Sequence, residues 1–229
     1  MPELTQYINR VKDLSTSPIV ILDAGHGGIY FSGNPVTKGK GFKHSGLPMH
    51  HKDYFCEGWG NRIAADQVAA VARLYGVHVS RFYDDIIDTK VEARVHAANK
   101  LYQGLSATDK KRCVFISLHS DADDKSNATR GCKIFRNADT RDLDKRSHEL
   151  AKMAQGFIEA MQIPELTRVG IHTAPNFFVL KHTEMPAILI ERGFHTNKDD
   201  AVMLCQTIFL QLIKAAEATI AANKPTWLY

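Results

Sequence analysis

Apolar and polar residues follow one another along this chain in segments that predict strands and helices in alternation. Short apolar runs, which are typical of buried strands, occupy residues 19–22, 113–120 and 187–191. Weaker patterns predict further strands at residues 77–82, 131–136 (near a sheet edge) and 177–180. Apolar residues at helical spacing predict helices at residues 58–76, 91–102, 143–161 and 198–222. Asn197 and Asp200, three residues apart, resemble a capping box at the start of the last helix.

Strands that alternate with helices predict one α/β domain, with an open, mostly parallel sheet flanked by helices. We place this domain at residues 19–222, after a lead at residues 1–18 and before a tail at residues 223–229. Residues 25–56 are rich in Gly, Lys and His and are predicted to form one long loop. Loops of that length are commonly functional or disordered.

Composition narrows the possible classes of protein. The 229 residues are 44% hydrophobic and 24% charged, as in a globular protein, and the net charge is +4. The chain has neither a basic cluster that would bind nucleic acid nor an apolar run that would span a membrane. It also lacks a signal peptide, so we expect synthesis in the cytoplasm. Its four cysteines form no CxxC pair, and only Cys56, in a polar loop, leaves a thiol role open.

Polar side chains gather where the predicted strands end. The first strand leads to Asp23 and His26, and the strand at residues 113–120 leads to His119 and Asp121. Glu191 ends the strand at residues 187–191, and Glu57 lies at the first turn of a helix. Ligands in open α/β sheets bind beyond the carboxyl ends of the strands, so we expect these side chains to share one rim.

Two imidazoles and one carboxylate are a recurrent ligand set for catalytic zinc. A further carboxylate off the metal can act as the general base of a hydrolase. Plainer interpretations remain open: a core histidine at His119, or a glutamate favoured by the helix dipole at Glu57. The turn at His26 lacks both phosphate-binding glycine patterns, and an unpaired Glu191 at the end of an apolar strand would be costly.

Other polar residues near this rim receive supporting roles. We expect His172 and His195 to contact substrate, and Asp121 to lie close to the centre. Asp23 is expected to orient the site from behind its ligands. Three histidines in the long loop are left without a role: His44, His50 and His51.

Six segments, in this order, resemble one enzyme family: LDAGHGG, EGWGN, EARVHAAN, FISLHSDA, GCKIF and MPAILIERGFHTNKDD. The chain resembles the zinc-dependent N-acetylmuramoyl-L-alanine amidases of the amidase-3 type. The resemblance implies one Zn²⁺ per chain, with His26, Glu57 and His119 as ligands and Glu191 as the catalytic glutamate. It also implies a structural role for Arg94 and Asn99.

The reaction implied is hydrolysis of the amide between N-acetylmuramic acid and L-alanine in peptidoglycan. The spacing from His26 to Glu57 exceeds the usual family spacing, so residues 29–56 are interpreted as an inserted loop that shapes substrate access. This makes Asp53 the competitor of Glu57 as a ligand.

We expect a monomer that acts on the cell wall after release, with a phage endolysin preferred over a bacterial wall enzyme. Another zinc peptidase acting on peptides and a non-catalytic wall-binding relative are the alternatives.

Overall fold

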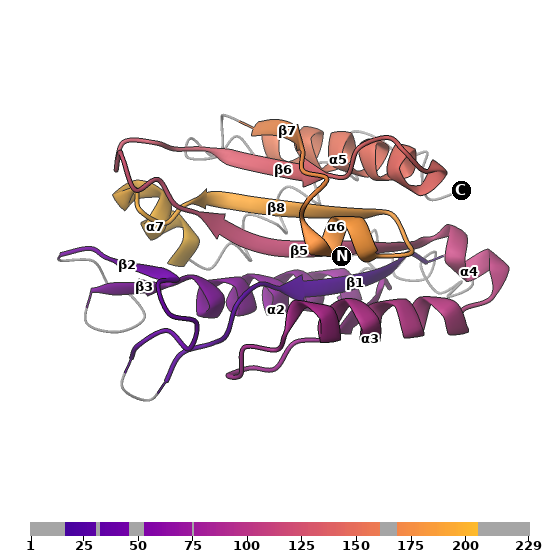
Figure 1. Ribbon diagram of the computed structural model, residues 1–229, viewed down its shortest axis with the longest axis horizontal. Coiled ribbons are helices and arrows are strands. Elements are labelled where there is room, and N and C mark those ends of the chain that lie inside the picture. Colours follow the sequence, from indigo (N-terminus) through magenta and orange to yellow (C-terminus); the bar gives the residue numbers. More distant parts are fainter. Residues whose placement is uncertain (1–16, 31–32, 46–52, 75, 161–168, 206–229) are drawn as a thin grey trace, which may run out of the picture.

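A computed structural model describes residues 17–30, 33–45, 53–74, 76–160 and 169–205. Its centre is a six-stranded sheet, in which every pairing is parallel except the one between β8 and β6 (Figure 1). In spatial order the strands are β4 (His78–Arg81), β1 (Ile19–Ala24), β5 (Cys113–Asp121), β8 (Ala187–Phe194), β6 (Cys132–Arg136) and β7 (Val169–Thr173). The predicted fold class, a single α/β domain with a mostly parallel sheet, is confirmed.

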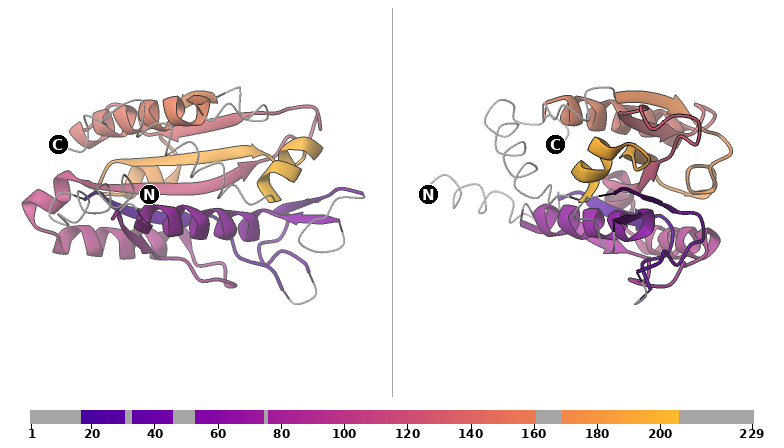
Figure 2. Two further views of the ribbon diagram at one scale, coloured as in Figure 1. Left: turned by 180° about the vertical axis from the view of Figure 1, so that it is seen from behind. Right: turned by 90° about the vertical axis from the view of Figure 1, so that its left-hand side faces the viewer.

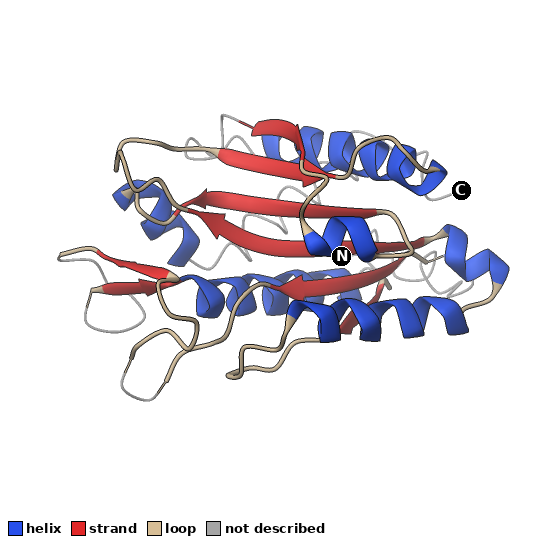
Figure 3. Ribbon diagram, viewed as in Figure 1, coloured by secondary structure: helices blue, strands red, loops and turns tan. Residues whose placement is uncertain are grey.

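Helices cover both faces of this sheet (Figures 2 and 3). On one face lie α2 (Glu57–Leu74), α5 (Asp142–Ala160) and α7 (Lys198–Cys205), and on the other α3 (Val91–Gly104) and α6 (Phe178–His182). Neighbouring residues of a strand point to opposite faces, so each strand contributes to both cores. Leu189, for example, packs in the core of the α3 side, whereas Ile188 packs in that of the α5 side.

Two short segments differ from the sequence prediction. Residues 177–180 were predicted as a strand, which is wrong, because Phe178–His182 forms helix α6. A four-residue apolar run fits either structure, and here one helical turn buries Val179 and Leu180 together. The edge strand β7 and the short helix α4 (Ala107–Lys111) had no prediction. Neither carries the long apolar pattern that marks a buried element.

The predicted loop at residues 25–56 contains a small hairpin, so its prediction as loop throughout is wrong. Strand β2 (Gly41–Lys43) pairs antiparallel with β3 (Tyr54–Cys56), which leads directly into α2. The hairpin extends past the carboxyl ends of β1 and β5 in Figure 1. Of the unassigned histidines, His50 and His51 lie outside the described residues.

Only one side of the predicted capping box forms: the Asn197 side chain caps the helix, but the Asp200 side chain does not bond back to Asn197. Asn197 Oδ1 accepts hydrogen bonds from the backbone nitrogens of Asp199 and Asp200, at 3.0 and 3.2 Å. The Asp200 carboxylate accepts from the backbone of Phe194 and Gly131 instead of returning to Asn197. Residues 206–222 of the predicted helix lie outside the described part of the chain. Within the described part, no helix is long and apolar enough to cross a membrane.

Candidate metal centre and active site

The glycine-rich turn after β1 positions His26. The His26 backbone adopts φ 63°, in the left-handed region, and its carbonyl accepts a hydrogen bond of 2.7 Å from Arg62 Nη1. Gly25 makes room for the second histidine, because a Cβ at Gly25 would lie 1.9 Å from Cε1 of His119. The glycine before His26 therefore allows the two imidazoles to meet at the sheet edge.

Glu57, the first residue of α2, joins both histidines through one carboxylate oxygen. Its Oε1 lies 3.4 Å from His26 Nε2 and 3.2 Å from His119 Nδ1. The backbone nitrogen of Ser120 donates a further hydrogen bond of 3.3 Å to the same oxygen. Glu57 itself is only 1% exposed, so this contact lies in a largely dry environment.

These three residues can hold a metal ion. One ligand atom from each of His26, Glu57 and His119 lies within 4.8 Å of the others. Tetrahedral ligands at zinc bond lengths are separated by about 3.3 Å, close to the histidine–carboxylate distances here. Burial alone would raise the pKa of Glu57, but hydrogen bonds from His119 and His26 hold it well below its usual range. The carboxylate is thus ionised, as a zinc ligand must be, and the donor set fits zinc.

Glu191 faces this centre from the next strand. It pairs with His119 across β8 and β5, so both side chains lie on the same face of the sheet. Its buried Oε2 has no hydrogen-bond partner among the described residues. Burial, together with the negative charges of Glu57 and Asp121, raises the pKa of Glu191 to about 8. Two neighbouring carboxyl groups whose pKa values move in opposite directions are typical of acid–base sites.

Three polar residues that support the centre escaped the sequence analysis. Asn61 donates to the Gly25 carbonyl at 3.2 Å and accepts a 2.8 Å hydrogen bond from the buried Arg192. Burial lowers the pKa of Arg192 to about 10. Arg62 links the His26 turn to α2 and to the loop at Asp84. Asn61 lies in the EGWGN segment and Arg192 in the MPAILIERGFHTNKDD segment, although neither received a role there, whereas Arg62 lies in none of the quoted segments.

Asp23 lies at the end of β1, but its partners are structural. Its two carboxylate oxygens bond to Arg94 and to the Ser117 hydroxyl, so they are engaged away from the histidines. Arg94 and Asn99 both connect elements of the fold, as the motif suggested. Asn99 bonds the Glu184 nitrogen and the His182 carbonyl.

Unlike Asp23, Asp121 acts electrostatically on the candidate base Glu191. Its carboxylate accepts a hydrogen bond of 2.6 Å from Lys133 Nζ. Lys133 pairs with Glu191 across β6 and β8, which brings this ion pair beside the candidate base. Asp121 is also one of the charges that raise the pKa of Glu191.

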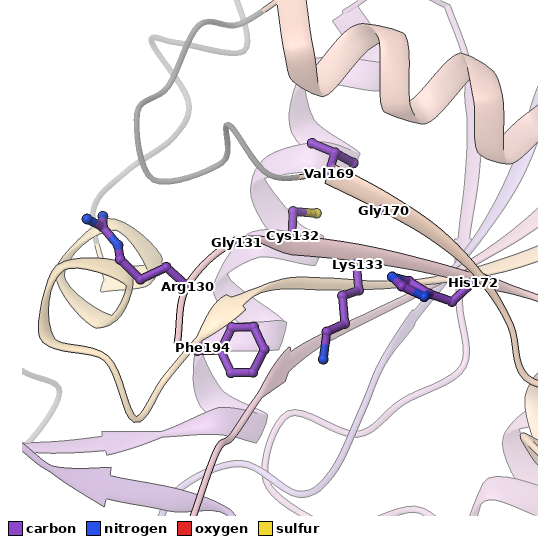
Figure 4. A pocket seen from close by; sticks show the side chains of 8 residues that line it. All are labelled: Arg130, Gly131, Cys132, Lys133, Val169, Gly170, His172 and Phe194. Carbon is purple, nitrogen blue, oxygen red and sulfur yellow. The ribbon is translucent and has the colours of Figure 1, made fainter. Parts of the chain in front are cut away.

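The two candidate substrate-contacting histidines lie apart. His195 is buried, and burial lowers its pKa; its Nδ1 lies 3.0 Å from the Ser120 hydroxyl. His44 Nε2 lies 2.7 Å from the His195 carbonyl oxygen, so one loop histidine packs against the site's wall. His172 is exposed on β7 and lines a separate pocket of about 280 Å³ with Lys133 and Phe194 (Figure 4).

The two alternative candidates are not part of the ligand cluster found among the described residues. Asp53 has φ 65° and its carbonyl accepts a hydrogen bond from the His44 nitrogen, next to the pairing of β2 with β3. Cys56 is buried, its thiol contacts the Gly33 carbonyl at 3.7 Å, and burial raises its pKa to about 11. A thiol with so high a pKa is a poor metal ligand.

Comparisons with known proteins identify the family and the fold that this chain resembles. The Amidase_3 family model, described as N-acetylmuramoyl-L-alanine amidase, matches residues 20–222. The probable cell wall amidase LytH of Staphylococcus epidermidis is 25% identical over 209 residues, which are 90% of this chain and 59% of that protein. This chain therefore spans 59% of the length of the first curated relatives it matches.

Solved structures share the fold. The amidase Ami1 of Mycobacterium smegmatis superimposes with a TM-score of 0.66 at 19% identity, covering 90% of this chain and 98% of that one. The N-acetylmuramoyl-L-alanine amidase of Clostridium difficile 630 gives 0.64 at 21% identity, covering 91% and 99%.

Proposed function

This chain belongs to the Amidase_3 family of N-acetylmuramoyl-L-alanine amidases, and we propose that it is a zinc-dependent hydrolase of peptidoglycan. The bond cleaved is the amide between the lactyl group of N-acetylmuramic acid and L-alanine. The observation that carries this proposal is the combination of a metal-capable triad with Glu191 on the adjacent strand, whose Oε2 has no hydrogen-bond partner among the residues that the structure describes. Binding of zinc by His26, Glu57 and His119 is part of the proposal.

Each of the four residues has a defined task. The two histidines and Glu57 hold the metal, which supplies Lewis-acid activation of the amide carbonyl and a nucleophile at neutral pH. Ser120 and the Gly25 turn keep the Glu57 carboxylate and the His119 ring in place. Glu191 is the general base, because its Oε2 has no hydrogen-bond partner in the described part of the chain and its side chain lies on the same face of the sheet as His119.

The proton balance of the reaction runs through Glu191. In its ionised form, Glu191 accepts a proton from the water that attacks the carbonyl carbon. The new C–O bond forms, the C–N bond breaks, and the protonated Glu191 gives its proton to the departing alanine nitrogen. The second proton of the water leaves the new carboxyl group and protonates the released amine, so the products are a lactyl carboxylate on the glycan and a peptide with an amino-terminal alanine ammonium. Glu191 returns to its starting state after each turnover.

The setting of the enzyme also belongs to the proposal. We propose a monomer that meets peptidoglycan outside the cytoplasm. Lysis of a host by a phage endolysin remains the preferred role, and wall remodelling by a bacterium the alternative. Added enzyme that clears a suspension of intact or permeabilised cells would favour the lytic role.

Digestion of purified peptidoglycan tests the reaction directly. We expect mass spectrometry to find released stem peptides with a new amino-terminal alanine, and intact glycan strands with lactyl carboxylates. A chelator should abolish this release and added zinc should restore it. Cuts within the stem peptide would contradict the amidase proposal and favour a zinc peptidase acting on peptides.

Metal content of single variants tests the ligand set. His26→Ala and His119→Ala should each lose bound zinc and all measurable hydrolysis, because two ligands hold zinc poorly. The matched control is His96→Ala on the exposed side of α3, which should retain both. Retention of a full equivalent of zinc by both ligand variants would contradict the assignment.

A further inference from the structure

The hairpin β2–β3 brings a lysine to the candidate metal centre. Its register pairs Gly41 with Cys56, and the next pair is Lys40 with Glu57, whose nitrogen donates to the Lys40 carbonyl at 3.1 Å. Opposite residues in an antiparallel pair project to the same side. The register of the hairpin, rather than the reach of a flexible loop, therefore aligns Lys40 with the carboxylate of the triad.

Lys40 contacts the oxygen of Glu57 that the histidines leave free. Its Nζ lies 3.9 Å from Oε2, whereas Oε1 faces His26 and His119. Oε2 is buried and has no hydrogen-bond partner among the described residues. The Lys40 side chain is 44% exposed, in contrast to 2% for Glu57, so its ammonium lies at the solvent side of the centre.

The charge of Lys40 also acts on the candidate base. Burial, Glu57 and Asp121 raise the pKa of Glu191, and Lys40 opposes that rise. The ammonium is thus within electrostatic range of both glutamates of the candidate site, Glu57 and Glu191. Water reaches it from one side, and the ligand cluster lies on the other.

The rest of the hairpin's inner face fixes this position. Residues two apart along a strand share a face, so Lys40 lies on the side of Phe42 and His44. His44 contacts the His195 carbonyl, and the ring of Phe55 stacks on His195 at 5.5 Å between centroids. Lys43, one residue out of phase, is exposed on the opposite side. The hairpin thus presents one of its lysines to the centre and the other to solvent.

A cation next to a metal site repels the metal, and a lysine there weakens metal binding unless another charge compensates. Amide hydrolysis provides such a charge, since the carbonyl oxygen becomes negative in the transition state and the product is a carboxylate. Donors aimed at a developing negative charge are among the largest contributions to catalysis. A partly exposed ammonium beside Glu57 is suited to this task.

We propose that Lys40 is a catalytic residue of the amide hydrolysis, donating a hydrogen bond to the scissile carbonyl oxygen as that oxygen becomes negative. This inference rests on the proposed function. Lys40 donates a hydrogen bond and transfers no proton, so the proton transfers are still those of Glu191. After cleavage the same ammonium pairs with the lactyl carboxylate of the glycan product.

Steady-state kinetics of Lys40→Met, Lys40→Arg and the control Lys43→Met test this role. We expect Lys40→Met to lose about 10- to 100-fold in kcat with little change in KM. Lys40→Arg should recover part of the loss, because it restores the charge and a donor. Lys43→Met removes the same charge from the outer side of the hairpin and should behave as wild type.

Two binding measurements separate catalysis from a structural role. Zinc should bind Lys40→Met as tightly as wild type or more tightly, because a repelling charge is gone. Calorimetry with N-acetylmuramic acid, which carries the lactyl carboxylate, should show weaker binding to zinc-loaded Lys40→Met. Weaker zinc binding together with full recovery of kcat at saturating zinc would overturn the proposal, since Lys40 would then only position Glu57.

The kinetic outcomes also distinguish this inference from the proposed function. An active wild type with an unchanged kcat in Lys40→Met, or with a change in KM alone, overturns the role of Lys40 only. A wild type that does not release peptides with amino-terminal alanine overturns the proposed function itself.

Discussion

Asp23 and Glu191 are two carboxyl groups on the same face and near the same edge of one sheet, yet their surroundings differ. Asp23 is 2% exposed and bonds to Arg94 and Ser117 through its two oxygens. Glu191 has a buried oxygen without a partner among the described residues, and negative neighbours raise its pKa. A fully bonded buried carboxylate stabilises the fold, whereas an unsatisfied one is typical of a functional site.

The most severe test of this contrast removes the charge of Glu191. We expect Glu191→Gln to lose about 10²- to 10⁴-fold in kcat, because a general base is lost. Zinc content, measured by elemental analysis, should stay at the wild-type level, since the ligand cluster does not include Glu191. The control is Glu184→Gln, whose exposed carboxylate bonds only to Gln103 among the contacts described. If Glu191→Gln lost zinc while Glu57→Ala kept it, the roles of the two glutamates would be reversed.

The same exchange at Asp23 should damage stability instead. Asp23→Asn leaves the buried Arg94 without its countercharge, which typically costs about 3–5 kcal/mol of unfolding free energy. Urea denaturation measures this loss, and kcat per folded molecule should remain near wild type. Asp66→Asn, which breaks the exposed ion pair with Arg81, should cost less than about 1 kcal/mol. A stable Asp23→Asn with impaired kcat would restore Asp23 to the active site.

The sign of the stability change sharpens the contrast further. The pKa of Glu191 in the metal-free fold is about 8, above its ordinary value of 4.5. The folded protein therefore binds this proton more tightly than the unfolded chain, and stability falls as the pH rises from 4.5 towards 8. Glu191→Gln removes that loss, so the metal-free variant should exceed wild type in stability near pH 8, by a few kcal/mol at most. Replacing the carboxyl group by a side-chain amide should therefore destabilise the fold at Asp23 and, near pH 8, stabilise the metal-free fold at Glu191.

A smaller effect is expected at Asp121. Burial, Glu57 and Asp121 raise the pKa of Glu191, and Asp121→Asn removes one of these charges and frees the Lys133 ammonium. Both changes favour ionised Glu191. The acid limb of kcat/KM against pH should therefore move to lower pH. If the acid limb of the kcat/KM profile did not move while the zinc content stayed at the wild-type level, a group other than Glu191 would control that limb.

Much of the fold was predictable because long apolar segments have one favourable arrangement. The strand at Cys113–Asp121 and the helix at Glu57–Leu74 follow directly from their patterns, and both are confirmed. The strand predicted at residues 177–180 was wrong, because a short apolar run fits a helical turn as well as a strand. The hairpin within the predicted loop was missed for a similar reason, since its strands have three residues each.

The candidate site was predictable to the extent that its residues end strands. His26, His119 and Glu191 follow apolar runs, and the parallel sheet aligns such ends at one edge. Glu57 begins helix α2 and does not end a strand, so its prediction as a ligand depended on the EGWGN motif. Lys40, Arg62 and Arg192 belong to no periodic pattern, and their partners lie in other segments of the chain.

The sequence by itself determined the α/β order of this protein and the polar residues at its strand ends, because apolar spacing and strand exits are local properties. Only the tertiary structure decided that the Asp23 carboxylate is paired with an arginine, whereas Glu191 Oε2 has no hydrogen-bond partner among the described residues. It also decided that the hairpin β2–β3 aligns Lys40 with Glu57. Burial, charge and hydrogen bonding between distant segments set these properties, and they exist only once the chain has folded.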